Sequence, residues 1–166
     1  EQLKPYLNST PQRPGMILHG FRDPQLGPVV MKLLHPSFLT PVDDKAEEDH
    51  RRSLVKNFYE ELSRASIAPF NHNNIIRIRP NLARFSINGV VVFGLVMEEL
   101  QPLLPSNLSR QDLIQLIGDS GSALEYMHNK GSVHLDIKTE NILRRINPDG
   151  SQAFVVSDLG SVLHTE

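Results

Sequence analysis

VHLDIKTENILRRINPDGSQAFVVSDLG, residues 133–160, is the stretch that decides the fold. It contains two apolar runs, at 142–146 and 153–157, which are separated by NPDG. Proline and glycine in such a short connection favour a hairpin turn. A hairpin would bring the residue before the first run next to the residue after the second. We therefore expect three side chains to share one pocket, those of Asp136, Asn141 and Asp158.

The same stretch resembles the catalytic core of eukaryotic-type protein kinases, whose pattern is H-R-D-L-x-x-x-N followed by D-F-G. The corresponding segments here are HLDIKTEN and DLG. The resemblance implies that Asp136 accepts the proton of the attacking hydroxyl and that Lys138 steadies the transferred phosphate. It also implies that Asn141 and Asp158 hold Mg²⁺. A carboxylate-rich turn without catalytic function is the alternative interpretation.

Two positions depart from the family pattern. Leu135 stands where the kinase arginine would be, and that arginine normally meets a phosphorylated activation loop. Its absence argues against activation by phosphorylation of such a loop. Leu159 replaces the phenylalanine of D-F-G, an apolar exchange that can preserve packing. Neither change removes a group that phosphoryl transfer requires.

Composition excludes several classes of function. The chain has 166 residues, 39% of them apolar, enough for a sizeable core but short for more than one ordinary domain. A net charge of −2 gives no general attraction for nucleic acid or anionic membranes. The absence of cysteine excludes disulfides, thiol nucleophiles and cysteine-ligated metals. No membrane span or signal peptide is visible, and the cytoplasm is the expected compartment.

The N-terminal third reads as a pair of strands, at 16–21 and 28–34, the second rich in valine. Within it VVMK resembles the V-A-I-K strand of kinases, which implies that Lys32 contacts the nucleotide phosphates. An exposed lysine at a sheet edge is the alternative. Gly15 stands where the last glycine of a phosphate-binding loop would fall. The prolines around it remove amide donors that such a loop supplies.

A helix is expected from about Asp43 or Asp44, either of which can cap it, to just before Pro69. In the kinase family this helix carries a glutamate that pairs with the strand lysine. Glu61 is the first choice, because it neighbours apolar residues of the helix, and Glu60 is the alternative. A glutamate on a solvated face remains possible for either one.

The next segment, HNNII at 72–76, resembles the family's H-P-N-I and is expected to open a half-buried strand, with Arg77 and Arg79 on its polar face. A hairpin follows over 85–96, with the two-residue turn Asn88-Gly89. Its second arm runs into MEEL, which matches the kinase hinge. The resemblance implies that the Glu98 carbonyl and the Leu100 amide bind adenine. An acidic strand end is the alternative.

The clearest helix begins at Ser109, where Ser109 and Asp112 form a capping box, and ends at Gly131. Gly118 and Gly121 lie inside it, and we expect close packing against a neighbouring element to offset their cost. The basic pairs Arg51-Arg52 and Arg144-Arg145 are expected to be solvated. The helix is predicted to bury one stripe of side chains: Leu113, Leu116, Ile117, Leu124 and Met127.

Together these elements predict a protein-kinase-like α+β fold. Residues 1–100 would form an antiparallel-sheet N-lobe with one helix and the hinge, and residues 101–166 a truncated, mainly helical C-lobe. The implied function is ATP-dependent phosphoryl transfer to Ser or Thr of a protein substrate, with ATP and Mg²⁺ bound between the lobes. Two alternatives stay open: a catalytically idle, pseudokinase-like interaction module whose exposed apolar surface binds a partner, and a fragment of a longer kinase.

Overall fold

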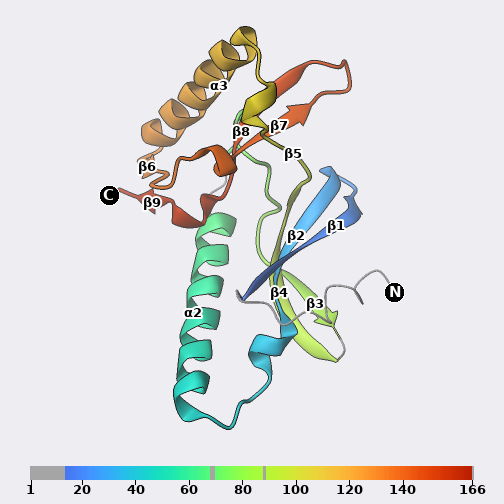
Figure 1. Cartoon of the computed structure of the whole chain (residues 1–166), viewed down its shortest axis with the longest axis vertical. Coiled ribbons are helices and arrows are strands. Elements are labelled where there is room, and N and C mark those ends of the chain that lie inside the picture. The colour runs from blue at the N-terminus through green and yellow to red at the C-terminus, as the bar shows by residue number, and fades with distance from the viewer. Residues whose placement is uncertain (1–13, 68–69, 88, 166) are drawn as a thin grey trace.

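The computed structural model describes residues 14–67, 70–87 and 89–165. Its N-terminal part is a four-stranded antiparallel sheet in the order β1-β2-β4-β3, accompanied by the long helix α2 (Figure 1). Residues 1–13, with the prolines that they contain, and Asn88 of the predicted two-residue turn lie outside the described residues. The elements are β1 (Gly15–Asp23), β2 (Gly27–Leu34), α2 (Lys45–Ile67), β3 (Ala83–Ile87) and β4 (Val90–Glu98).

The C-terminal part contains one helix and two small sheets. A three-stranded sheet has the order β5-β7-β8, and a two-stranded one pairs β6 with β9. This arrangement confirms the predicted α+β, kinase-like fold. Its elements are β5 (Gln101–Pro102), α3 (Arg110–Asn129), β6 (Ser132–Val133), β7 (Ile142–Ile146), β8 (Gln152–Val156) and β9 (Leu163–His164). Short 3-10 turns cover Pro36–Leu39, Pro105–Asn107, Thr139–Asn141 and Leu159–Ser161.

The hairpin of β7 and β8 forms where the turn residues predicted it. The Asn147 N–H donates to the Ser151 carbonyl at 2.8 Å, and the Gly150 N–H donates to the Asn147 carbonyl at 2.9 Å. Gly150 has φ +84°, in the left-handed region that favours glycine. In register, Ile142 pairs with Val156. The turn therefore holds the ends of HLDIKTEN and DLG side by side.

The predicted start of α3 is confirmed, but the predicted buried stripe is confirmed only in part. Ser109 and Asp112 form the reciprocal capping box. Met127 is fully buried, whereas Leu113 and Ile117 are 47% and 71% exposed. The buried side of α3 faces the β7–β8 hairpin, and nothing in the described residues covers its other side. Burial therefore followed the location of the neighbouring sheet instead of the full apolar pattern.

The two glycines of α3 also differ from the expectation. A Cβ atom at Gly118 or Gly121 would meet no described atom within 4 Å. Close packing in the described structure therefore does not explain either residue. Both lie on the same exposed half of the helix as the apolar residues left uncovered.

The segment 72–79 is not a strand, contrary to the prediction. Its first part bonds to one sheet and its second part to the other: Ile75 bridges to Val156 of β8, and Ile78 bridges to Met97 of β4. Because its backbone groups are shared between two sheets, it cannot form a continuous ladder with either. It acts instead as a connection between the two parts of the molecule.

One core cluster runs through both parts. Leu62 of α2, Met127 of α3 and Val155 of β8 are fully or almost fully buried within it. A second cluster lies on the other face of the four-stranded sheet, because successive strand residues point to opposite faces. On β2, Val29, Met31 and Leu33 join this second cluster. The β2 residues that alternate with these three point to the opposite face of the sheet, where the candidate site lies.

Within the described ranges, neither helix is long and apolar enough to cross a membrane.

Candidate active site

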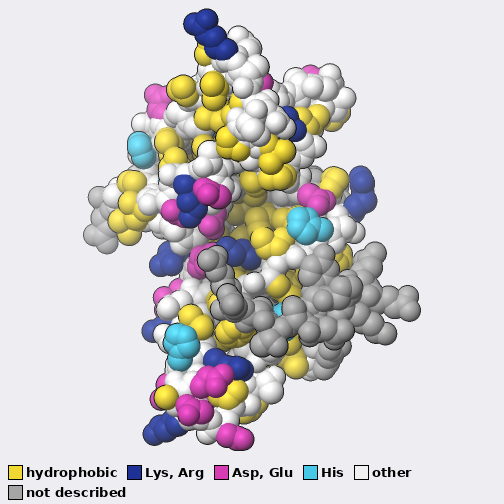
Figure 2. Space-filling model, viewed as in Figure 1, with side chains coloured by type: hydrophobic (Ala, Val, Ile, Leu, Met, Phe, Trp, Pro, Cys, Tyr) yellow, Lys and Arg dark blue, Asp and Glu magenta, His cyan; other side chains and the backbone are white. Residues whose placement is uncertain are grey.

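A cavity of about 400 Å³ lies between the four-stranded sheet, α2 and the β7–β8 hairpin. Figure 2 shows a hollow in the middle of this face, with hydrophobic side chains inside it and charged side chains around it. The apolar part of the wall suits a flat ring, and the charged part places one lysine, Lys32, among carboxylates. Its apolar lining includes Val30, Leu95, Met97, Leu100, Leu143 and Leu159.

Most of the site residues predicted from the sequence meet at this cavity. Those that line it are Lys32, Glu61, Glu98, Leu100, Asn141 and Asp158. Asp136 and Lys138 lie in the adjoining loop, which Asn141 ties to the cavity wall through its bonds to Asp136.

Gly15 is not brought into the cavity. It is the first residue of β1 and pairs with Leu34 of β2. A Cβ atom there would lie 2.7 Å from the ring of Phe58 on α2. The lack of a side chain at Gly15 thus allows α2 to pack against the sheet, in place of the phosphate contact that the sequence suggested.

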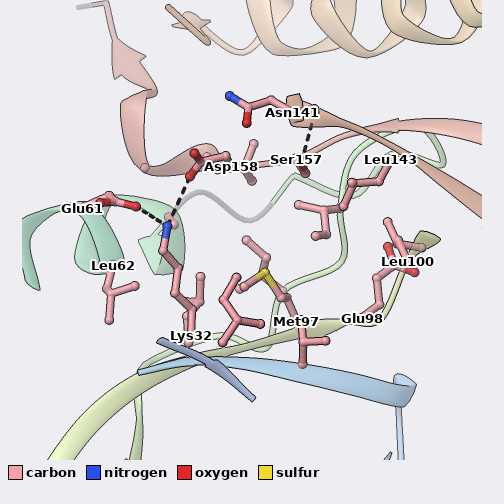
Figure 3. Close-up of a pocket in the computed structure, with 18 of the residues that line it drawn as sticks. Lys32, Glu61, Leu62, Met97, Glu98, Leu100, Asn141, Leu143, Ser157 and Asp158 are labelled. Carbon is pink, nitrogen blue, oxygen red and sulfur yellow. Dashed lines mark hydrogen bonds and ion pairs between the residues drawn. The ribbon is translucent and has the colours of Figure 1, made fainter. Parts of the chain in front are cut away.

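Lys32 joins three segments that are distant in sequence (Figure 3). Its ammonium donates to the Glu61 carboxylate of α2 and lies 3.5 Å from a carboxylate oxygen of Asp158. Burial alone would lower the pKa of Lys32, but the charges of Asp158 and Glu61, with the hydrogen bond to Glu61, outweigh it and raise the pKa. The lysine is therefore a permanent cation at the cavity. Glu60, the alternative partner, instead lies 3.7 Å from Lys56 on the exposed side of α2.

Asp158 is held in an uncommon backbone conformation, with φ +58° and ψ +62°. A residue with a side chain rarely adopts this left-handed region, and such strain concentrates at functional sites. The turn that follows packs against α2, where the Arg64 Nε atom donates to the Gly160 carbonyl at 2.9 Å. The contact to α2 thus fixes the turn that presents the Asp158 carboxylate to Lys32.

Gly160 is required by this contact, and its replacement has a predictable effect. A Cβ atom at Gly160 would lie 2.1 Å from the Cγ atom of Glu61. We expect Gly160→Ala to push Glu61 away from Lys32 and to lower the free energy of unfolding by about 1 to 3 kcal/mol. Thermal denaturation measures the loss.

Gly121→Ala is the matched control for that substitution. A Cβ atom at Gly121 meets no described atom within 4 Å, and the position lies inside a helix. Here the same change should raise the free energy of unfolding, by up to about 1 kcal/mol, because alanine favours the helix. Equal effects of the two substitutions would contradict the tight contact between Gly160 and Glu61.

His134 braces the loop that carries Asp136. Its ring is buried, and its Nε2 atom lies 2.8 Å from the Ser157 carbonyl, which can only accept a hydrogen bond. The proton therefore sits on Nε2, and the Nδ1 atom accepts the Asp136 N–H at 3.3 Å. Leu135, between them, has φ +65°. One buried imidazole thus ties the backbone of this loop to the residue that precedes Asp158.

The carboxylate of Asp136 has two donors. The Lys138 ammonium donates to its Oδ2 atom at 2.7 Å and the Asn141 amide at 2.9 Å. The hydrogen bond from Lys138, followed by that from Asn141, holds the pKa of Asp136 below its ordinary value, and the same bond raises the pKa of Lys138. Asp136 is therefore an oriented, ionised carboxylate at neutral pH.

Asn141 and Asp158 have the donor atoms that a magnesium ion prefers. The Asn141 amide nitrogen is committed to Asp136, at 2.8 and 2.9 Å, which leaves the amide oxygen as its acceptor on the cavity side. Asp158 adds carboxylate oxygens. Across the described chain, no group of three His, Cys, Asp or Glu side chains is placed to hold a metal. Magnesium needs only one or two protein oxygens when phosphates supply the others, so the pair fits it.

Residues of the predicted hinge line the cavity. Val30, Lys32, Leu95 and Met97 line the cavity, and Glu98 follows Met97 on β4. Because strand side chains alternate, the Glu98 carboxylate turns to the opposite side, where it is buried. The next residue, Glu99, accepts from His19 of β1 at 2.8 Å at the rim, a contact with no signal in the sequence.

Arg145 is the main residue whose burial was predicted wrongly from the sequence. It was expected to be solvated, but it is buried and forms an ion pair with Glu98. Arg144 and Arg145 are neighbours on a strand, so they must point to opposite faces. That rule could have indicated that one of the two arginines faces inward and requires a buried anion.

Comparison with known proteins agrees with this geometry. Residues 40–166 match the protein kinase domain family. The chain is 28% identical over 144 residues to CBL-interacting serine/threonine-protein kinase 16 of Arabidopsis thaliana, covering 78% of this chain and 28% of that protein. It is 32% identical over 102 residues to inhibitor of nuclear factor kappa-B kinase subunit alpha of Gallus gallus, covering 54% and 13%.

A further relative is the dual serine/threonine and tyrosine protein kinase of Apis mellifera, 29% identical over 125 residues, with 70% of this chain and 12% of that protein covered. The chain thus spans less than a third of the length of these relatives. The family match covers most of the chain, including α2, the His134–Asn141 loop and the turn after Asp158. On these matches and this geometry, the chain belongs to the protein kinase domain family.

Proposed function

We propose that the chain binds ATP with Mg²⁺ in the cavity and transfers the terminal phosphate to a Ser or Thr hydroxyl of a protein. The observation that carries this proposal is the position of Lys32, whose ammonium contacts both Glu61 and Asp158 at the cavity. Phosphoryl transfer depends mainly on positioning and charge neutralisation, and this constellation supplies both.

Each part of the nucleotide has a matching part of the cavity. The apolar walls, including Met97 and Leu143, would enclose the adenine ring, with the Glu98 carbonyl and the Leu100 amide at its polar edge. Lys32 would contact the phosphates, oriented by Glu61. Asn141 and Asp158 would hold Mg²⁺, which neutralises phosphate charge when bound.

Asp136 would orient the attacking hydroxyl. Its carboxylate is ionised and is fixed by Lys138 and Asn141, so it can accept a hydrogen bond from the hydroxyl group. As the hydroxyl oxygen forms its bond to the terminal phosphorus, the bond from phosphorus to ADP breaks and the hydroxyl proton passes to Asp136. Lys138, two residues from Asp136, would steady the transferred phosphate. The cleft then releases ADP and the phosphorylated protein.

A thermal-shift experiment tests nucleotide binding. ATP with Mg²⁺ at 100 times its dissociation constant stabilises the folded state by about 2.7 kcal/mol. For a chain of this size we expect Tm to rise by roughly 5 to 10 °C. ATP with EDTA is the control, because Asn141 and Asp158 require the ion. No shift at millimolar ATP would overturn the proposal that this cavity is a nucleotide site.

A second candidate function is an idle kinase-like module that binds a partner. One observation favours it: Leu113, Ile114 and Ile117 of α3 are 47%, 57% and 71% exposed, an apolar surface on one helix. Under this alternative ATP with Mg²⁺ causes no thermal shift. The chain instead associates through this surface of α3 in sedimentation experiments, and Ile117→Asp should abolish that association. A rise of Tm with ATP and Mg²⁺, together with phosphate transfer, would exclude this second candidate function.

A further inference from the structure

A buried ion pair lies directly behind the hinge. Glu98, at the end of β4, and Arg145, on β7, form a two-pronged contact in which the Arg145 Nε atom donates to Glu98 Oε2 at 3.0 Å and its Nη2 atom donates to Oε1. The two side chains are only 7% and 11% exposed. A pair of charges this deeply buried is retained only where its geometry is nearly ideal.

The same two side chains also hold the segment that connects the two parts of the molecule. Arg145 donates through Nη1 to the Asn73 carbonyl, and Glu98 accepts the Arg77 N–H at 2.8 Å. The Glu98 N–H in turn donates to the Arg77 carbonyl at 3.0 Å. Hydrogen bonds of the Arg145 guanidinium and of Glu98 therefore link three elements: the hinge, β7 and the connecting segment.

Arg145 is also linked to the cavity wall through its own strand. Leu143 lines the cavity, and Arg145 is two residues further along β7, so their side chains leave the strand on the same face. Glu98 belongs to the wall between this cavity and a second one behind the hinge, which Arg145 also lines. The ion pair thus joins the strand that bounds the base pocket to the hinge that would recognise the base.

We propose that Glu98 and Arg145 are positioning residues that set the hinge backbone at the distance and angle required to select an adenine base. The inference rests on the proposed function, since it assigns a task within that nucleotide site. Neither side chain touches the nucleotide: each acts through the Glu98 carbonyl and the Leu100 amide. Without the pair, the hinge would still close the cavity but would no longer hold these two groups in one place.

The test compares ATP with GTP, two nucleotides that share phosphates and differ in the polar edge of the base. In Arg145→Met the affinity for ATP should fall on the order of tenfold, about the loss of one hydrogen bond between the displaced hinge and the base. The affinity for GTP, which gains little from the hinge, should change much less. A purely structural loss would weaken both nucleotides equally and would overturn the proposal.

Arg144→Met is the matched control. It removes the same charge from the adjacent position of β7, where the half-buried guanidinium bonds to Gln101 at 2.8 Å and makes no contact with Glu98. The affinities of Arg144→Met for ATP and for GTP should stay within about twofold of those of the unsubstituted chain. If Arg145→Met does not fold, Arg145→Lys and Glu98→Gln keep most of the volume. Both should still lower the preference for ATP, because neither retains the two-pronged charged contact.

Hydrogen exchange of the amides at 97–101, measured without nucleotide, separates this inference from the proposed function. These amides should exchange faster in Arg145→Met than in Arg144→Met. Unchanged exchange would overturn the positioning role even if ATP binds. If the unsubstituted chain fails to bind ATP while exchange still rises, the nucleotide site is wrong and the pair is shown to order only the hinge.

Discussion

Asp136→Asn is expected to lower the rate of phosphate transfer by roughly 10²- to 10⁴-fold, the usual contribution of a positioned acid or base. The asparagine keeps the size of the side chain and one oxygen that can accept from Lys138 or Asn141. It loses the negative charge that orients the hydroxyl and receives its proton. Nucleotide affinity should therefore change little, and transfer of labelled phosphate to a generic protein substrate measures the loss.

Asp149→Asn is the control for that substitution. Asp149 accepts from Ser151 in the exposed turn between β7 and β8, so its replacement removes the same charge away from the cavity. Its transfer rate should match that of the unsubstituted chain. Equal transfer by Asp136→Asn and Asp149→Asn, at equal ATP affinity, would defeat the assigned role of Asp136 and leave the fold untouched.

The pH dependence of transfer follows from the same contacts. Lys138, and then Asn141, hold the pKa of Asp136 below 3.8, the ordinary value for an aspartate. The active form is the ionised one, and protonation at low pH removes it. Protonation of this group should therefore not limit transfer until the pH falls below 3.8. In Lys138→Met the largest cause of the lowered pKa is removed, and this acid limb should move upward towards that value.

Lys32→Met is expected to lower kcat/KM for ATP by roughly 10²- to 10³-fold, as when one preorganised donor to developing charge is removed. The ammonium is the cation that Glu61 and Asp158 hold at the cavity, and methionine keeps most of the unbranched side chain without its charge. The two carboxylates would then face the phosphates unneutralised. Both the thermal shift with ATP and the transfer rate should fall.

Lys56→Met provides the matched control, because Lys56 lies on the exposed side of the same α2 helix, 3.7 Å from Glu60. An exposed pair of this kind contributes little. Its removal should leave both measurements unchanged. A full thermal shift with ATP in Lys32→Met would show that the nucleotide does not use this lysine, and the assignment of the cavity would then fail.

Local structure was predictable wherever neighbouring residues determine it. The capping box of Ser109 and Asp112 satisfies its hydrogen bonds within four residues, so α3 begins where the sequence predicts. The NPDG turn needs only its own backbone geometry and hence produced the expected hairpin. The choice of Glu61 over Glu60 also rested on local periodicity, and it is Glu61 that the structure places against Lys32.

Burial was predictable only in part, because it depends on elements far away in sequence. The apolar pattern of α3 does not say which apolar residues meet another element, and the hairpin covers Met127 but not Ile117. Segment 72–79 has the alternation of a strand, yet its groups pair with two different sheets. Gly15 stands where the last glycine of a phosphate-binding loop would fall, but the ring of Phe58 occupies the space beside it.

The sequence by itself determined the order of the chemical groups, the hairpin that brings Asn141 and Asp158 to neighbouring strand ends, and the limits of the main helices, because these depend on short-range geometry. Only the tertiary structure decided which charges are removed from water. Arg144 and Arg145 are the same residue type one position apart, and the buried carboxylate of Glu98 selects Arg145. A buried charge requires a partner from another segment, and no local pattern specifies where that partner lies.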